Sequence, residues 1–266
     1  MTGHVTAPPA ALADRMPTWV TLLRAPNPGP MTLEGTNTWV VRAPGAAGAV
    51  VIDPGPADPQ HLAAVADRGP IALILLTHGH EDHTEGVDDL RAMTGATVCG
   101  PVGVTGPDRR PLADGDLLDA AGVRIQVLAT PGHTADSACF LVEGEGERAI
   151  FTGDTILGRG TTVVAHPDGN LGDYLASLAA LSAYSGVPAL PGHGPALADC
   201  AVAADFYLAH RRARLEQVRQ AVAAGATTAD EVVDRVYAEL DPALRPAALW
   251  SVRAQLDYLS KEGETP

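Results

Sequence analysis

A run of aliphatic residues followed at once by a histidine-rich segment constrains this chain more than any other feature. Residues 71–76 read Ile-Ala-Leu-Ile-Leu-Leu, a length and composition typical of a strand that is buried on both faces. His78, His80, Asp82 and His83 follow that strand directly. An extended His-x-His places two imidazoles on one side of the chain, while Asp82 and His83 turn toward a second point. Such a cluster suits a borderline-soft divalent metal such as zinc.

Three further candidates stand where other predicted strands end. His133 lies in a Pro-Gly-His-Thr segment, His193 in a Pro-Gly-His-Gly segment, and Asp154 in a Thr-Gly-Asp segment. A Pro-Gly turn fixes where the strand stops and leaves a ligand-bearing loop at its end. A single histidine after Pro-Gly is more often a surface turn residue. Five histidines and two aspartates in this pattern instead indicate one metal centre.

The order of predicted elements indicates an α/β sandwich followed by a small helical module. The strands are expected at residues 36–41, 49–52, 71–76, 96–99, 117–119, 123–128, 138–142, 148–151 and 187–190, and the intervening helices at residues 58–67, 85–93 and 173–183. After about residue 200 the pattern is helical only, with helices expected at residues 201–223, 230–239 and 246–259. We therefore divide the chain into domains at residues 1–207 and 208–266.

Charge and cysteine content limit which binding partners and which cellular compartment we expect. The chain has 18 basic and 32 acidic residues, a net charge of -14, which disfavours tight, non-specific binding to duplex nucleic acid. Cys99, Cys139 and Cys200 are far apart and form no Cys-x-x-Cys pair, which favours a reducing compartment. Residues 1–18 contain no apolar signal-like stretch, and the run at 71–76 is too short to span a bilayer. We expect a cytoplasmic protein that does not bind membranes.

These motifs resemble those of the metallo-β-lactamase fold superfamily, whose members hold two metal ions in a four-layer αββα sandwich. The resemblance implies that one ion is bound by His78, His80 and His133, and the other by Asp82, His83 and His193. Asp154 would bridge the two ions. A bridging aspartate is usual in glyoxalase II and in RNase Z-like nucleases, whereas zinc β-lactamases lack it, so β-lactamase activity is expected to be weak at most.

A narrower resemblance covers nearly the whole chain. Residues 27–39 (Asn-Pro-Gly-Pro-Met-Thr-Leu-Glu-Gly-Thr-Asn-Thr-Trp), residues 156–163, residues 173–178 and the His210-Arg211 pair are similar to motifs of the beta-lactamase-like protein 2 family. Members of that family end in a small winged-helix-like domain, which here would be residues 208–266. The animal member is a mitochondrial endoribonuclease that acts on single-stranded RNA.

The implied cofactors are two Zn²⁺ ions, with Mn²⁺ or Fe²⁺ as alternatives, because imidazole and carboxylate ligands accept all three. Two such ions about 3.5–4 Å apart share a water and lower its pKa from 15.7 to about 7. The resulting hydroxide attacks a carbonyl carbon or a phosphorus atom. Asp82 and Asp154 are therefore the catalytic side chains that we predict together with that hydroxide. No side-chain nucleophile is evident, since the sequence has no Gly-x-Ser-x-Gly motif.

Several other residues have two readings each. Asp53, at a predicted strand end, either accepts a hydrogen bond from a ligating imidazole or is a plain turn residue. Asn37, Thr161 and Thr162 either donate hydrogen bonds to a phosphate or carboxylate of the substrate or serve turn geometry. The basic cluster of His210, Arg211, Arg212, Arg214 and Arg219 is either a phosphate clamp or a solvated helix face.

The leading hypothesis is a dinuclear-zinc endoribonuclease acting on single-stranded RNA, although an aromatic content of only 4% leaves few rings on which bases could stack. The alternative is a glyoxalase II-like hydrolase of a small anionic ester or thioester. A third hypothesis is a metal-stabilised binding protein without catalysis. The C-terminal module is expected either to cover one edge of the metal cleft or to mediate a homodimer.

Overall fold

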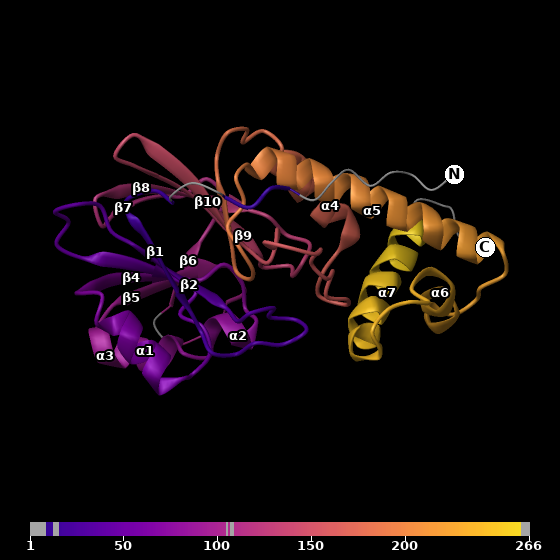
Figure 1. Cartoon of the computed structure of the whole chain (residues 1–266), viewed down its shortest axis with the longest axis horizontal. Coiled ribbons are helices and arrows are strands. Elements are labelled where there is room, and N and C mark those ends of the chain that lie inside the picture. The colour runs from indigo at the N-terminus through magenta and orange to yellow at the C-terminus, as the bar shows by residue number, and fades with distance from the viewer. Residues whose placement is uncertain (1–8, 13–15, 105, 107–108, 262–266) are drawn as a thin grey trace.

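The computed structural model describes residues 9–12, 16–104, 106 and 109–261, and two facing β-sheets organise them (Figure 1). The first sheet has the order β1-β2-β3-β4-β5-β6 and the second the order β11-β10-β9-β8-β7. The strands of the first sheet are β1 (Val20–Arg24), β2 (Asn37–Val41), β3 (Ala49–Ile52), β4 (Ile71–Leu75), β5 (Thr97–Pro101) and β6 (Arg109–Leu112). Those of the second are β7 (Leu117–Ala120), β8 (Val123–Ala129), β9 (Ala138–Gly144), β10 (Glu147–Gly153) and β11 (Ala189–Pro191).

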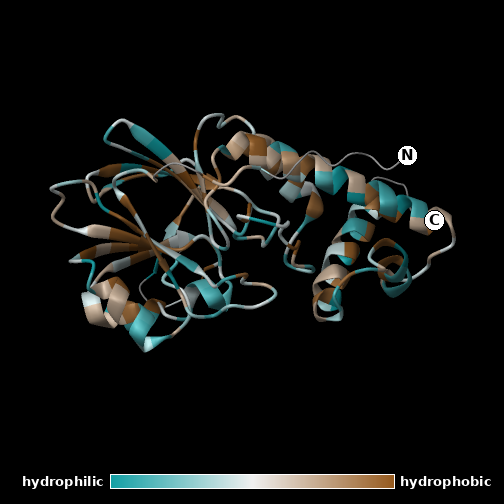
Figure 2. Cartoon of the chain, viewed as in Figure 1, coloured by the Kyte–Doolittle hydropathy of each residue, from teal (hydrophilic) through white to brown (hydrophobic). Residues whose placement is uncertain are grey.

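Apolar side chains fill three layers of core between and outside the sheets, and Figure 2 shows that the strands are the most hydrophobic part of the chain. Between the sheets, the rings of Trp39 and Phe151 meet edge to face with centroids 5.9 Å apart. Helices α1 (Pro59–Ala66) and α3 (Val87–Thr94) cover the outer face of the first sheet. Helices α4 (Leu171–Leu181) and α5 (Cys200–Ala223) cover the second. The four-layer αββα sandwich is therefore confirmed.

The C-terminal helices form the predicted module at one end of the molecule (Figure 1). Helix α5 extends beyond the sandwich, and α6 (Ala229–Val236), a 3-10 turn (Pro242–Leu244) and α7 (Arg245–Lys261) pack against it. A capping box starts α6, because the Thr228 side chain accepts from the Glu231 N–H and the Glu231 carboxylate accepts in return. Residue 207, the expected boundary, lies inside α5, where the Tyr207 hydroxyl exchanges hydrogen bonds with the Leu157 backbone. The division of the chain at that residue stays a prediction.

Two strands and one helix break were not expected from the sequence. Strands β1 and β6 are the edges of the first sheet, and their short, partly polar sequences carry little signal before a neighbour pairs with them. The helix expected at 85–93 begins only at residue 87, as α3, and a separate short helix, α2 (Glu81–Thr84), precedes it, with the break at Glu85 and Gly86. A Cβ atom at Gly86 would lie 2.8 Å from the Leu62 side chain, so close packing requires the glycine that interrupts the helix.

The fold brings several strand ends to one edge of the sandwich. Strands β3 and β4 run parallel in the first sheet, and β10 and β11 run parallel in the second. Their carboxyl ends, together with that of β8, lead into the loops that carry the predicted site residues. Among the described residues, no helix combines the length and the apolar character that a membrane span requires.

Candidate metal centre

The structure brings all seven predicted ligand side chains together. They come from loops or short helices that follow β4, β8, β10 and β11. Their donor atoms form three overlapping groups, in each of which the atoms lie within 4.8 Å of one another. The groups are His78, His80 and His133; His78, His83 and Asp154; and Asp82, His83 and His193.

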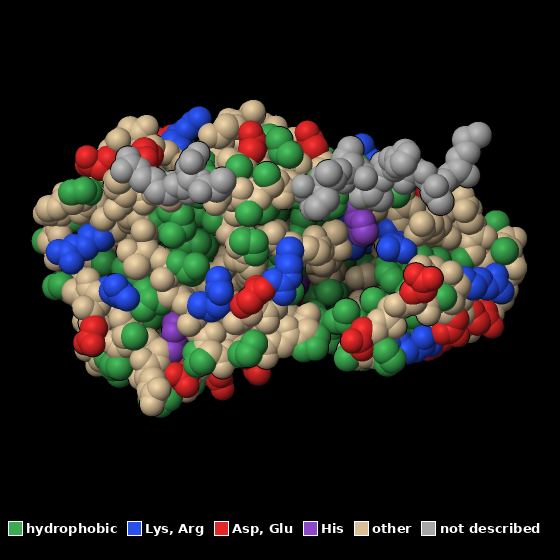
Figure 3. Space-filling model, viewed as in Figure 1, with side chains coloured by type: hydrophobic (Ala, Val, Ile, Leu, Met, Phe, Trp, Pro, Cys, Tyr) green, Lys and Arg blue, Asp and Glu red, His purple; other side chains and the backbone are tan. Residues whose placement is uncertain are grey.

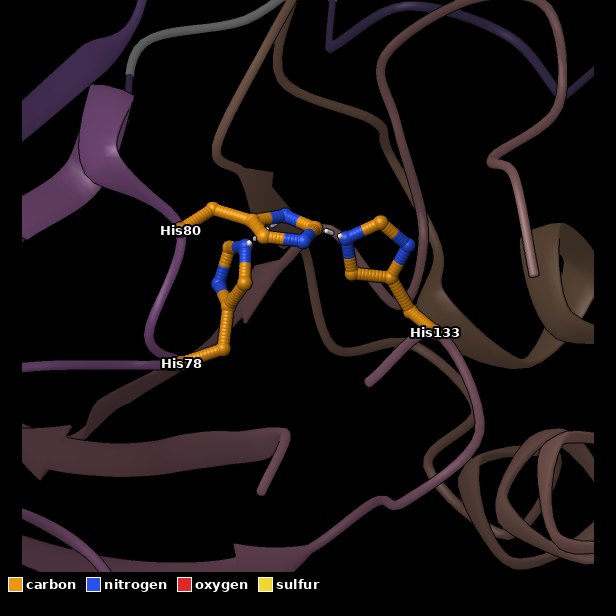
Figure 4. A group of neighbouring side chains, drawn as sticks. All are labelled: His78, His80 and His133. Atoms are coloured by element: carbon orange, nitrogen blue, oxygen red, sulfur yellow. Dashed lines mark hydrogen bonds between the residues drawn. The ribbon is translucent and has the colours of Figure 1, made fainter. Parts of the chain in front are cut away.

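The first group, which we call the three-histidine set, consists of His78, His80 and His133. His80 Nδ1 lies 3.1 Å from His78 Nε2 and 3.1 Å from His133 Nε2 (Figure 4). A ring nitrogen carries at most one hydrogen, so hydrogen bonds among these three nitrogens cannot satisfy them all. Three converging imidazole nitrogens are instead the donor set that a divalent transition-metal ion requires.

The second group, the mixed set, consists of Asp82, His83 and His193. His193 Nε2 lies 3.1 Å from Asp82 Oδ2 and 3.2 Å from His83 Nε2. Asp82 Oδ2 lies 3.4 Å from His83 Nε2. One carboxylate and two imidazoles therefore face a common point, as in the first set but with a negative charge included.

Asp154 lies between the two sets. Its Oδ1 is 3.5 Å from His83 Nε2, and its Oδ2 is 3.4 Å from His193 Nε2 and 3.8 Å from His133 Nε2. Oδ1 is buried and has no hydrogen-bond partner among the described residues. A buried carboxylate oxygen without a partner is costly, and a cation at this point would remove that cost. The position suits a residue that contacts two ions.

The fold also orients the imidazoles. In four of the five histidine ligand candidates, Nδ1 contacts an oxygen outside the cluster, which leaves the Nε2 lone pair facing the cluster. The contacts are His78 Nδ1 to Thr77 Oγ1 at 3.0 Å, His83 Nδ1 to Asp53 Oδ2 at 2.8 Å, His133 Nδ1 to the Val163 carbonyl at 2.6 Å and His193 Nδ1 to the Gly35 carbonyl at 3.4 Å. His80 is the exception and presents Nδ1.

Asp53 makes the contacts expected of an acceptor for a ligating imidazole, the first of the two roles that the sequence left open. It is 1% exposed and follows β3 with a left-handed φ of 52°. Oδ1 accepts from the Thr77 N–H at 2.8 Å, and Oδ2 accepts from the Thr77 hydroxyl at 2.7 Å as well as contacting His83. Asp53 thereby joins the histidine-bearing segment to the end of the neighbouring strand.

The two sets differ in their protonation. Burial, together with His83, holds the pKa of His78 well below its usual value, and burial also lowers the pKa of His133. Burial would lower the pKa of His83 too, but Asp82, Asp154 and Asp53 outweigh it and raise that pKa well above its usual value. For His193, Asp154 outweighs burial and raises the pKa to about 9. Without metal, lowered pKa values thus favour neutral rings at His78 and His133, and raised pKa values favour protonated rings at His83 and His193.

A cavity of about 340 Å³ opens beside the cluster, between the sandwich and the C-terminal module. Figure 3 shows the hollow between these two parts. His133 and Asp154 line it on the metal side, and His210, Arg211 and Arg214 line it on α5. Four of the predicted substrate contacts, Thr161, Thr162, His210 and Arg211, are therefore at the cavity wall.

Asn37, the fifth predicted substrate contact, has another environment. It is fully buried, and its amide group donates to the Pro191 carbonyl at 3.0 Å and the Gly194 carbonyl at 2.8 Å. Both donors are therefore used to hold the loop that carries His193. The structure gives this side chain a positioning function and not the substrate contact that we expected.

Sequence reasoning missed two residues that shape the site. Thr77 links Asp53 to His78, and its place beside the first histidine was the only available signal. At Gly192, a Cβ atom would lie 2.6 Å from both Asp154 Oδ1 and His83 Cε1. The Pro-Gly-His pattern thus reflects the close approach of the backbone to the cluster as well as the turn.

Comparison with known proteins agrees with this geometry. The Metallo-beta-lactamase superfamily model matches residues 31–193, and the Beta-lactamase associated winged helix domain model matches residues 228–265. The lactamase-like protein vrtG of Penicillium aethiopicum is 37% identical over 77% of this chain. The matched region spans 66% of the length of vrtG. A beta-lactamase-like protein 2 homolog of Caenorhabditis elegans is 32% identical over 92% of this chain and 85% of its own.

A solved structure shows the same architecture. A metallo-beta-lactamase family protein of Thermus thermophilus superposes with a TM-score of 0.76 and 26% identity, covering 92% of this chain and 94% of its own. The family match spans most of the sandwich, and the candidate ligands lie inside it or at its last residue. This chain therefore belongs to the metallo-beta-lactamase superfamily of metal-dependent hydrolases and carries the winged helix domain associated with it.

Proposed function

We propose that this chain is a dinuclear metal hydrolase of small anionic esters or thioesters. The observation that carries the proposal is the cavity in which metal-ligand candidates, cationic side chains and an apolar wall meet. Its volume of about 340 Å³ is in the range of sites for small molecules, roughly 300–1,000 Å³.

The residues present fit two divalent ions. The three-histidine set would hold one ion, the mixed set the other, and Asp154 would contact both. Such a pair of ions, when bound, supplies an ionised water at neutral pH and polarises the oxygen of the scissile group. Five imidazoles and two carboxylates suit zinc, while Mn²⁺ and Fe²⁺ accept the same ligands.

The remaining wall of the cavity supports a small anionic acyl compound as the substrate. Arg214 Cζ lies over the Tyr237 ring, 4.4 Å from the ring centroid. Arg214 Nη1 donates to the Val236 carbonyl at 3.1 Å. Burial, together with Arg211 and Arg214, lowers the pKa of His210 to about 4, so this part of the wall is already rich in positive charge. The cavity wall also contains apolar side chains, among them Leu240, Leu244, Ala247 and Ala248. An acyl group with an anionic substituent would complement both surfaces.

Single-stranded RNA is the second candidate, because the chain is similar over 92% of its length to a beta-lactamase-like protein 2 homolog and the cationic wall could contact phosphates. The net charge of -14 and the cavity wall weigh against it. Among the described residues that line the cavity, Tyr237 is the one Phe, Tyr or Trp, and Arg214 covers one face of its ring. Single-strand sites usually offer several rings for stacking.

One experiment separates the two substrates. The purified protein, loaded with Zn²⁺ or Mn²⁺, is incubated in parallel with carboxylate-bearing acyl thioesters and with labelled single-stranded RNA, each with and without chelator. We expect chelator-sensitive thioester hydrolysis and intact RNA. Chelator-sensitive cleavage of RNA without thioester turnover would replace the first candidate by the second.

A further inference from the structure

Arg211 is a buried arginine without a carboxylate partner in the described part of the chain. Its side chain lies on α5 and the residue is 3% exposed. Its Nε has no hydrogen-bond partner there, and its Cζ lies over the Tyr174 ring, 5.3 Å from the ring centroid. Burying a guanidinium without a counter-charge is costly. This environment also excludes the solvated helix face as a description of Arg211.

The polar contact that Arg211 does make leads to a metal-ligand candidate. Its Nη2 donates to the backbone carbonyl of Thr162. The Thr162 hydroxyl lies 3.3 Å from His133 Nδ1, and the carbonyl of the next residue, Val163, lies 2.6 Å from the same nitrogen. His133 Nδ1 therefore donates its hydrogen to the Val163 carbonyl, and Arg211 holds the carbonyl of the preceding residue, Thr162.

The segment that makes these contacts is irregular, although the buried Val164 side chain and a hydrogen bond from the Ala165 N–H to the His133 carbonyl also hold it. Residues 157–165 belong to no helix or strand. Arg211, in contrast, is fixed by a 24-residue helix that packs on the sandwich and continues into the C-terminal module. The contact from α5 is the one that holds the Thr162 carbonyl, directly before the Val163 carbonyl that receives the His133 hydrogen.

We propose that Arg211 is a positioning residue for the three-histidine set. It holds the Thr162 carbonyl so that Val163 accepts from His133 Nδ1 and directs Nε2 at His80 and Asp154. The mixed set has a different support, Asp53, and is independent of this contact. This inference rests on the proposed function only in that the cluster binds metal, whatever the substrate.

The test measures metal retention at each set without any substrate. The full-length protein is loaded with Co²⁺ and titrated with a competing chelator, and the loss of visible absorption is followed for wild type, Arg211→Met, Arg211→Lys and Arg212→Met. Arg212 is the exposed neighbour of Arg211 on the same helix and serves as the matched control. His80→Ala and Asp82→Ala identify which spectral component belongs to which set.

We expect Arg211→Met to weaken the binding of one ion by about 10- to 100-fold, which is the usual effect of removing a residue that hydrogen-bonds a metal ligand from outside. That ion should be the one lost in His80→Ala. Arg211→Lys, which keeps a donor, should recover part of the affinity, and Arg212→Met should match wild type. Equal weakening of both ions, or none, in Arg211→Met would overturn the proposal.

Circular dichroism and thermal melting of each variant establish that it is folded. If Arg211→Met does not fold, Arg211→Lys decides the question, with selective weakening expected and either equal weakening or wild-type retention contradicting it. Wild-type protein that retains two ions but hydrolyses no ester would refute the proposed function and leave this inference standing.

Discussion

The two halves of the cluster are supported in different ways. In the three-histidine set, uncharged oxygens receive the outer hydrogens of His78 and His133, and one of these oxygens belongs to a loop held from α5. In the mixed set, the buried carboxylate of Asp53 contacts His83 directly from the end of β3. Support from the C-terminal side of the molecule therefore reaches only the first set, through His133, whereas Asp53 contacts a ring of the second set directly.

This difference has a consequence for charge. The imidazoles of the three-histidine set have lowered pKa values at His78 and His133, so these rings can accept an ion without first releasing a proton. Those of the mixed set have raised pKa values, so an ion must displace protons there. We expect the first ion to bind at the three-histidine set when the pH is near neutral.

Asp154→Ala should have the largest effect because Asp154 contacts both halves. Losing the charge that joins them removes several kcal/mol of transition-state stabilisation, on the order of a thousandfold in kcat/KM. Steady-state hydrolysis and elemental analysis of the purified variant measure this. Activity within about tenfold of wild type would show that Asp154 is not shared by two ions.

Asp53→Asn should act more strongly on the mixed set than on the three-histidine set, because Asp53 contacts His83 directly and reaches His78 only through Thr77. Asparagine has nearly the same shape and tolerates the left-handed backbone at this position, but it removes the carboxylate that receives the His83 hydrogen. We expect about 10- to 100-fold weaker binding at the mixed set. The Co²⁺ competition described for Arg211 measures it, and the pair of variants should give opposite patterns. Weakening of the three-histidine set that equals or exceeds that of the mixed set in Asp53→Asn would contradict the division.

The stability of the metal-free protein should fall as the pH rises from about 6.5 to 9. The pKa of folded His193 is about 9 and that of folded His83 is also raised, against 6.5 as the usual value. Groups with a raised folded pKa contribute stability below the unfolded pKa and lose it as the pH passes the folded pKa. Metal displaces these protons, so the metal-loaded protein should not show the decrease.

Urea unfolding at several pH values, with and without chelator, checks this. A metal-free protein whose unfolding free energy is constant over that range would mean that His83 and His193 are neutral in the absence of metal.

His61→Gln should have the smallest effect. His61 is also buried, and its Nε2 lies 2.9 Å from the Thr38 hydroxyl, but it belongs to neither set. Loss of that hydrogen bond should cost about 1 kcal/mol of stability and leave metal retention unchanged. Thermal melting and elemental analysis measure both; a loss of bound metal would show that the cluster extends beyond the two sets.

Much of the fold was predictable because local patterns are strong in this chain. The apolar run before His78 predicted β4, and the turn residues between 41 and 49 and between 119 and 123 predicted paired strands that the structure contains. The edge strands β1 and β6 were missed because their short, partly polar sequences carry little local signal. Their conformation depends on hydrogen bonds to a neighbouring strand.

The sequence by itself determined which side chains could meet, since each ligand candidate directly follows a strand or a Pro-Gly turn, and such signals are local along the chain. The tertiary structure alone decided what holds them. Asn37 contacts Pro191 across 154 positions, and Arg211 contacts Thr162 across 49. Hydrogen bonds between residues so far apart exist only once the sheets and α5 have packed, because burial there leaves each donor only the acceptors that the fold places beside it.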